Sequence, residues 1–188
     1  MSERERLVRA FAGVATENGF DRTSAGLVAE AADLPEDAFH RHFPTMEDCF
    51  MAYYAECVAE LRELLERAYH AQNDWRDGLE AALRAAIEAL ASDPERARLL
   101  VVEINSVGPR AARARAVAVA GFRQFFAERP ELPPLPDVVR KAFSGGIYTT
   151  IYNHVAAGRA AELRQALPAL SYFVLLPFSG SGSGSMTK

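Results

Sequence analysis

The sequence predicts an all-α protein in which a head of three short helices precedes a body of about six helices. Ala and Leu dominate the composition, with Glu and Arg around them, and all four residues favour helices. Apolar residues recur every three or four positions along most of the 188 residues, which is the period of a helix that buries one face. Short breaks rich in Gly, Pro, Ser and Asp separate these segments, so we expect a series of helices.

The first 45 residues form the expected head. Residues 3–18 carry one apolar stripe of helical period. Thr23 and Ser24 are suitable N-caps for a short helix through Ala32, and Pro35 suits the first position of a third helix. Three short helices with a brief turn between the second and the third are the plan of a helix-turn-helix.

Residues 46–178 form the expected body, which begins with one long amphipathic helix from Met46 to about Ala71. Residues 179–188 begin as a strict Ser-Gly alternation with nothing to bury, the pattern of a flexible tail or an engineered scar. Pro168 either starts or kinks the last helix. The helices that follow the long one are expected at 74–91, 94–105, 110–129, 137–157 and about 163–176.

Charge, cysteine usage and missing motifs limit the possible functions. The formal net charge of −4 provides no overall attraction to nucleic acid. Cys49 and Cys57 are eight positions apart on one expected helix, a rise of about 12 Å, whereas a disulfide needs Cα atoms within about 7 Å. Free thiols, the lack of a charged-then-apolar leader and the lack of a long apolar run lead us to expect a cytoplasmic protein that does not enter a membrane. The sequence has no P-loop, Gly-rich nucleotide fingerprint or H-E-x-x-H, so we expect no enzyme, no cofactor and no metal.

One segment resembles a known family. Residues 19–50 read G-F-D-R-T-S-A-G-L-V-A-E-A-A-D-L-P-E-D-A-F-H-R-H-F-P-T-M-E-D-C-F, and this stretch resembles the head of the TetR family of bacterial transcriptional regulators. Residues 145–163, followed by S-Y-F-V-L-L-P-F, resemble the last helix pair of many members. The landmarks of the head are Gly19, Phe20, Thr23, Val28, Ala29, Ala32, Leu34, Phe39 and Phe43.

The resemblance implies a repressor that binds double-stranded operator DNA as a homodimer. Its third helices would enter successive major grooves, and an unidentified small molecule bound in the body would release the DNA. Hydroxyl groups at a helix N-terminus suit phosphate, and exposed polar residues of the third helix suit base edges. The predicted DNA contacts are Thr23, Ser24, Pro35, Glu36, Asp37, Ala38, His40, Arg41, His42, Thr45 and Met46.

The head departs from the family pattern at four positions. Asp33 replaces the usual Gly of the turn, but Asp tolerates the left-handed conformation. Ala38 replaces a small hydroxyl residue and can contact only a thymine methyl. His40 stands where a Tyr usually contacts phosphate, and Met46 stands where a Lys usually does. The first 45 residues hold five arginines against eight carboxylates, a net charge of −3, so we expect weak non-specific DNA binding.

Three alternatives remain open at this stage. Glu36 and Asp37 either complement the helix dipole or accept hydrogen bonds from cytosine N4. The whole chain is alternatively a helical small-molecule-binding protein whose head has weak or lost DNA affinity. A third alternative is an enzyme that uses His70 or His154 as a base.

His40 and His42 are two positions apart on one helix, so they are a poor metal pair.

The body is expected to hold both a ligand site and a dimer interface. Polar residues on apolar helices are the best ligand candidates, because a buried polar group needs a partner. Adjacent helical glycines, each costing about 1 kcal/mol against Ala, indicate the close approach of another helix. The predicted ligand contacts are Tyr69, Asn105, Phe126, Tyr148, Tyr152 and His154. The predicted dimer contacts are Gly145, Gly146, Ile147, Ile151, Leu170, Phe173 and Val174.

Overall fold

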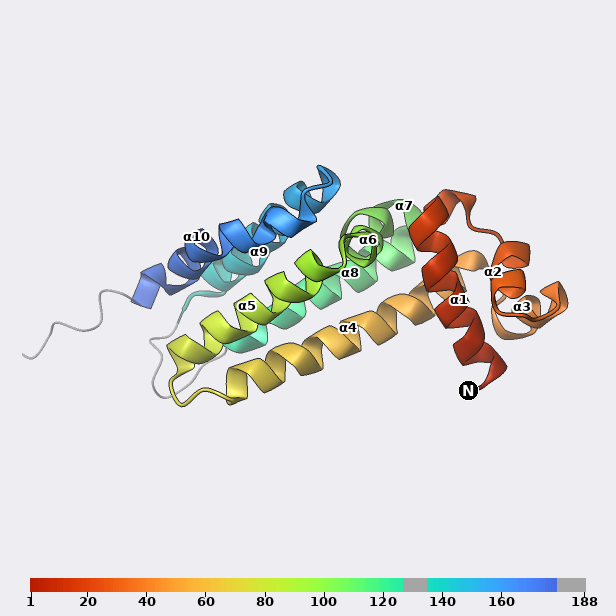
Figure 1. The fold of residues 1–188 in the computed structure, drawn as a ribbon. Helices are drawn as coiled ribbons and strands as arrows, with labels where there is room; N and C mark the ends of the chain where they lie inside the picture. Colours follow the sequence, from red (N-terminus) through yellow and green to blue (C-terminus); the bar gives the residue numbers. More distant parts are fainter. Residues whose placement is uncertain (127–134, 179–188) are drawn as a thin grey trace, which may run out of the picture.

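The computed structural model describes residues 1–126 and 135–178, and every regular element in these ranges is helical, as the sequence predicts (Figure 1). The head is at one end of the molecule, and the long helix α4 (Met46–His70) leads from it along the body. No helix in the described ranges has the length and hydrophobicity that a bilayer crossing requires.

Local sequence signals explain the three helices of the head. In α1 (Glu3–Asn18), the Ser2 hydroxyl accepts a hydrogen bond from the backbone N–H of Glu5, whose carboxylate accepts one from Ser2 N–H. Ser24 caps α2 (Ala25–Ala31) as predicted. Asp33 has a φ of 53°, so the turn before α3 (Glu36–His42) is left-handed, which Asp tolerates. Pro35 is at the N-cap of α3, one position earlier than expected.

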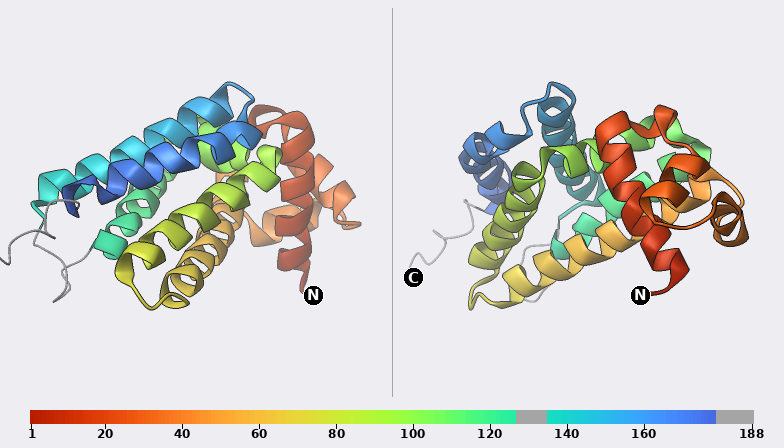
Figure 2. Two further views of the ribbon diagram at one scale, coloured as in Figure 1. Left: turned by 60° about the vertical axis from the view of Figure 1, so that its left-hand side comes forward. Right: turned by 45° about the vertical axis from the view of Figure 1, so that its right-hand side comes forward.

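The body has the predicted helix order. Residues 94–107 form one helical run, so the body has six helical segments in its described part. α9 and α10 lie side by side on one side of it (Figure 2). Pro168 lies inside the last helix. The elements are α4, α5 (Trp75–Ser92), α6 (Pro94–Arg98), η2 (Leu99–Glu103), α7 (Ile104–Val107), α8 (Pro109–Gly121), η3 (Phe122–Phe126), α9 (Asp137–Ala156) and α10 (Leu163–Leu175).

Two local departures from the predicted helices affect the site. The run expected at 94–105 is not uniform, because Leu99–Glu103 forms a π-helical turn between α6 and α7. Such turns are rare and occur frequently at functional sites. The helix expected at 110–129 leaves α-geometry after Gly121 and continues as a short 3-10 segment, η3, beyond which 127–134 are outside the described residues.

Two apolar cores meet at the π-helical turn. The head core includes the side chains of Phe11, Phe39 and Phe50, the last from the first turns of α4. It also takes in Leu99, so it extends into the body. Leu100, the next residue, packs against both cores. The turn therefore lies where the head and the body are in direct contact.

The two cysteines are free and buried, as the sequence predicts. Burial raises the pKa of the Cys49 thiol to about 12 and raises that of Cys57 as well. Because the thiolate is the reactive form, both side chains behave as small apolar core residues at neutral pH.

Gly78 allows α5 to begin close to the end of α4. A Cβ at this position would lie 2.9 Å from the Tyr69 carbonyl oxygen and 3.3 Å from the Tyr69 ring. We expect Gly78→Ala to lower the free energy of unfolding by about 1–3 kcal/mol, because backbone must move to make room. Urea unfolding followed by circular dichroism measures this change.

Gly13, within α1, is the matched control for Gly78. A Cβ there meets no atom within 4 Å, so Gly13→Ala should raise stability by up to about 1 kcal/mol through helix propensity alone. Equal unfolding midpoints for the two variants would contradict the close approach at Gly78.

Candidate functional site

The surface of α3 presents only part of the predicted DNA-contacting set. Glu36, Asp37, His40 and Arg41 are exposed. Ala38 is completely buried beneath them, with an exposed fraction of 0%. The predicted contact between Ala38 and a thymine methyl is therefore wrong for this head, because the methyl group of Ala38 packs inward.

Acidic partners neutralise the cations of α3. Arg41 forms an ion pair with Asp37 on the same helix, and its Nη2 lies 3.6 Å from a carboxylate oxygen of Glu3. His42 Nε2 lies 3.0 Å from the same Glu3 oxygen. The hydrogen bond from His42, together with the charge of Arg41, holds the pKa of Glu3 below its usual value. These pairs reduce the positive potential that a phosphate would meet.

The hydroxyl groups of the head are already engaged in its own structure. Thr23 is buried and its hydroxyl donates to the Gly19 carbonyl at 2.8 Å. The Ser24 oxygen accepts from Leu27 N–H at 3.3 Å, and Thr45 caps α4 through Asp48. Their predicted phosphate contacts stay predictions, with the exposed Ser24 and Thr45 better placed than Thr23.

A cavity of about 260 Å³ opens in the body between α4, α5, η2, α8, η3 and α9. Its wall is mostly apolar, and its polar groups include those of Tyr54, Arg115 and Tyr148. Tyr148 donates a hydrogen bond to the Val101 carbonyl at 3.0 Å. Of the five predicted ligand residues whose side chains the structure describes, Tyr148 is the one that lines this cavity.

The other predicted ligand residues lie elsewhere. Tyr69 is buried in the body core, with its ring centroid 5.4 Å from that of Phe125. Tyr152 packs beside Tyr148, and neither it nor Tyr69 lines the cavity. The side chain of Phe126 is outside the described residues.

Asn105 and His154 also lie off the cavity, because each bonds back to its own helical run. Asn105 donates to the Val101 and Val102 carbonyls. His154 Nδ1 lies 2.8 Å from the Thr150 carbonyl oxygen. The interpretation of polar residues as ligand contacts fails here because the backbone itself supplies their partners.

Arg115 is the residue of the cavity that sequence reasoning missed. Arg110, Arg113 and Arg115 together have the pattern of a solvated basic face. In the structure Arg110 pairs with Asp48 at 2.5 Å and Arg113 is exposed, whereas Arg115 lines the cavity. The sequence does contain a signal for this difference: Arg113 and Arg115 are two positions apart, and residues two apart on a helix point to different sides.

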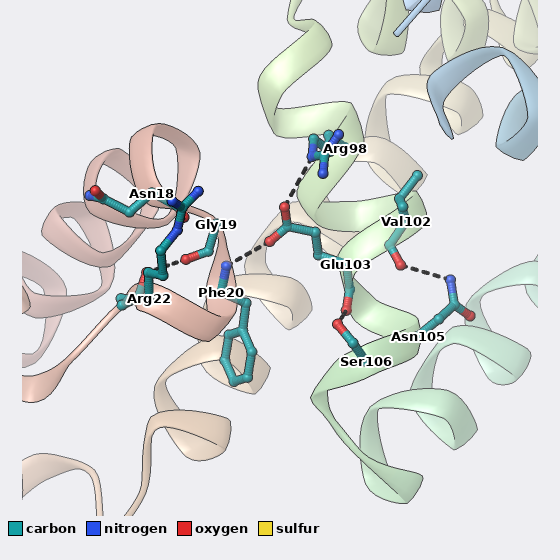
Figure 3. Close-up of polar contacts among 10 residues, drawn as sticks. Asn18, Gly19, Phe20, Arg22, Arg98, Val102, Glu103, Asn105 and Ser106 are labelled. Atoms are coloured by element: carbon teal, nitrogen blue, oxygen red, sulfur yellow. Dashed lines mark hydrogen bonds and ion pairs between the residues drawn. The ribbon is translucent and has the colours of Figure 1, made fainter. Parts of the chain in front are cut away.

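The π-helical turn joins the cavity to the head through Glu103 (Figure 3). One carboxylate oxygen of Glu103 accepts a hydrogen bond from the backbone N–H of Phe20 at 2.7 Å, and the other accepts from Arg98 Nε at 3.1 Å. The Glu103 side chain is only 12% exposed. Leu100 and Val101 of the same turn line the cavity. One helical turn thus contacts both the cavity and the head.

A second polar link lies at the start of α4, next to the head. Asp48 near the start of α4 accepts a hydrogen bond from Arg110 of α8. The bonds from Arg110 and then from the Thr45 hydroxyl hold the pKa of Asp48 below its usual value. This ion pair fixes the start of α4 against α8.

The predicted dimer residues divide into two groups. Ile147, Ile151, Leu170 and Val174 are buried within the protomer. Their assignment to the interface is corrected here, because the body core already covers them. Gly146 lies against the Phe173 ring, where a Cβ would be 3.2 Å away, so its close helix contact is within the protomer.

Other apolar side chains at the end of the last helix pair are exposed. Phe173 is 36% exposed, Tyr172 is 67% exposed and Leu176 is 50% exposed. At Gly145 a Cβ would meet no atom of the described chain within 4 Å. This part of α9 and α10 is therefore open to a partner.

Comparisons with known proteins agree with this architecture. The family model described as "Bacterial regulatory proteins, tetR family" matches residues 7–53, which span α1 to the first turns of α4. A search of curated protein sequences found no match.

Solved structures share the fold along nearly the whole chain. The fatty acid degradation regulator FadR from Bacillus halodurans has a TM-score of 0.77 at 14% identity, over 93% of this chain and 95% of that one. FadR from Bacillus subtilis, solved in complex with stearoyl-CoA, has a TM-score of 0.74 at 16% identity, over 92% and 96%. A TetR family regulator from Marinobacter aquaeolei has a TM-score of 0.66 at 16% identity, over 91% and 94%. The family model thus matches the head, and the solved structures share the fold of the chain as a whole.

Proposed function

We propose that this protein is a ligand-responsive transcriptional repressor that binds operator DNA as a homodimer and is released by a small molecule in the body cavity. The observation that carries the proposal is the π-helical turn Leu99–Glu103. Leu100 and Val101 line the cavity, and Glu103 binds the head at Phe20. A ligand that moves the wall of the cavity would therefore move a contact of the DNA-binding head.

The coupling needs two states that bind DNA with different affinity. The π-helical turn supplies an element with an alternative arrangement, because a return to α-geometry changes the register of the residues after it. The Val101 carbonyl accepts hydrogen bonds from Tyr148 and Asn105, which stabilise the present arrangement. A ligand that displaces Tyr148 would remove one of these bonds and favour the alternative.

The DNA-binding surface is the exposed side of α3 with the start of α4. Because Arg41 and His42 are partnered by acids, non-specific attraction is weak and specific contacts carry a larger share of affinity. The same ion pairs also favour the alternative function, a helical small-molecule-binding protein with a head of weak or lost DNA affinity.

A direct assay separates the two functions. Random duplex DNA is enriched on the full-length protein at low ionic strength, and an enriched duplex is then labelled for fluorescence polarisation. The repressor requires a specific complex that weakens as salt rises. Failure to enrich any sequence would leave only the ligand-binding alternative.

Met46→Lys tests where the head contacts DNA. Met46 is half-buried at the start of α4, close to the third helix. An added ammonium group there should tighten binding to any duplex and steepen the salt dependence by about one unit, because one more counterion is released. Polarisation titrations at several salt concentrations measure both effects.

Gln72→Lys makes the same charge change just beyond the other end of α4, where Gln72 is exposed. Its binding curve should match the wild type within a factor of about two, because exposed charges are screened beyond about 10 Å. An unchanged affinity for Met46→Lys would mean that the start of α4 does not face the duplex.

A further inference from the structure

Arg115 is a cation on the cavity wall for which the described residues provide no carboxylate partner. Its Nε is buried and has no hydrogen-bond acceptor in the described part of the chain. Its guanidinium carbon lies 5.2 Å from the centroid of the Tyr148 ring, a cation–π distance that holds the group in place. A partly buried guanidinium without an anion favours the entry of one.

The other charged residue of the wall differs from Arg115. Arg62 is 64% exposed at the rim, and its Nε lies 3.7 Å from the carboxylate of Glu66. Gln124, also on the wall, donates to the same carboxylate at 3.3 Å. The rim is therefore neutralised by its own acid, and among the described residues of the wall Arg115 is left as the uncompensated charge.

We propose that the cavity binds a compact apolar monocarboxylate whose carboxylate pairs with Arg115. This inference rests on the proposed function, in which the cavity is the effector site. It names the chemical class of that effector. The guanidinium group offers parallel N–H donors that match the two oxygens of a carboxylate, and Tyr54 and Tyr148 flank it.

The surroundings of Arg115 strengthen this pairing. Burial raises the pKa of Tyr54 to about 12, which marks this corner of the cavity as poorly hydrated, and the nearby Arg115 cation partly offsets the rise. Ion pairs are stronger where water is excluded. A neutral ligand of the same shape would leave Arg115 unpaired, and an amine would be repelled by it.

The cavity volume limits the size of the acid. About 260 Å³ corresponds to roughly nine water-sized groups at about 30 Å³ each. An acid of about eight carbons fills this space with its carboxylate at Arg115. A long acyl chain would extend beyond this volume.

The test is isothermal titration calorimetry of the full-length protein without DNA. The probes are octanoate, octan-1-ol and octylamine, with 4-phenylbutyrate and 4-phenylbutan-1-ol as a second matched pair. We expect each acid to bind at least tenfold more tightly than its alcohol, and octylamine to bind most weakly. An alcohol that binds as tightly as its acid, or no binding by either acid, overturns the proposal.

Two variants assign the preference to Arg115. Arg115→Met should reduce the acid-to-alcohol preference to less than about twofold while octan-1-ol still binds, which shows that the cavity is intact. Arg113→Met, an exposed neighbour on the same helix, should keep the full preference. If Arg115→Met does not fold, Arg115→Lys replaces it and should lower, but not abolish, the preference. A preference that persists unchanged without the guanidinium overturns the assignment.

A failure of the carboxylate proposal can be distinguished from a failure of the proposed repressor function. If octan-1-ol releases DNA in the polarisation assay and octanoate does not, the ligand class is wrong and the repressor stands. If octanoate binds through Arg115 but no DNA sequence is ever bound, the repressor is wrong and the carboxylate site stands.

Discussion

Replacing Glu103 with glutamine is expected to leave ligand binding intact while reducing the ligand's effect on DNA affinity by about tenfold or more. The Glu103 carboxylate accepts from two donors, Phe20 N–H and Arg98 Nε, and an amide offers only one oxygen. A hydrogen bond to a charged group contributes about 1.5–3 kcal/mol. That range is comparable with a typical allosteric coupling energy of about 1–3 kcal/mol. Losing one of the two hydrogen bonds of Glu103 is therefore enough to remove most of the coupling.

The measurement is a set of DNA-binding titrations by fluorescence polarisation, with and without saturating ligand, for wild type and Glu103→Gln. Calorimetry checks that the variant binds the same ligand with unchanged affinity for the cavity. Because coupling is reciprocal, the DNA duplex should also lose its effect on ligand affinity in the variant.

Glu95→Gln is the control for the Glu103 variant. Glu95 is an exposed acid of α6, a few residues from the π-helical turn, and its replacement removes the same charge. It should respond to ligand as the wild type does. Full ligand response in Glu103→Gln would show that the contact with Phe20 does not carry the signal.

Aspartate at both Tyr172 and Leu176 is expected to raise the dissociation constant of the proposed homodimer by about a hundredfold or more. Both side chains are largely exposed in the protomer, so the fold loses little when they change. In a two-fold dimer formed by α9 and α10, the new carboxylates would face those of the partner. Like charges placed across an interface cost several kcal/mol, and about 2.7 kcal/mol already corresponds to a hundredfold change.

Sedimentation velocity over a range of protein concentrations measures the dimer, and polarisation measures the accompanying loss of DNA affinity. Val117→Asp is the control for sedimentation alone, because Val117 is also an exposed apolar residue, 72% accessible, but on α8, where it lines the cavity. Val117→Asp should remain a dimer. If the double variant also sediments as a dimer, this surface of α10 is not the interface.

Much of the fold could be predicted from the sequence because the signals are local. Apolar periodicity, the cap at Ser24 and the break at Gly108-Pro109 each act within a few residues of the chain. The left-handed turn at Asp33 follows from side-chain chemistry alone. The two free cysteines follow from helix geometry.

The candidate site was less predictable, because its residues meet only through tertiary packing. Asn105 and Tyr148 were predicted to contact ligand as buried polar residues, but Asn105 is exposed and both side chains donate to the Val101 carbonyl. Helical periodicity does not reveal a π-helical turn of only five residues, because the segment is too short to separate its period from that of an α-helix.

The sequence by itself therefore determined that this protein is all-helical, with a helix-turn-helix head that matches the tetR family model over residues 7–53. Only the tertiary structure decided that Ala38 faces inward, that Arg115 faces a cavity and that Glu103 contacts Phe20. Glu103 and Phe20 are 83 positions apart in the chain. No local preference encodes such a contact, because it depends on how the two apolar cores pack against each other at one turn of helix.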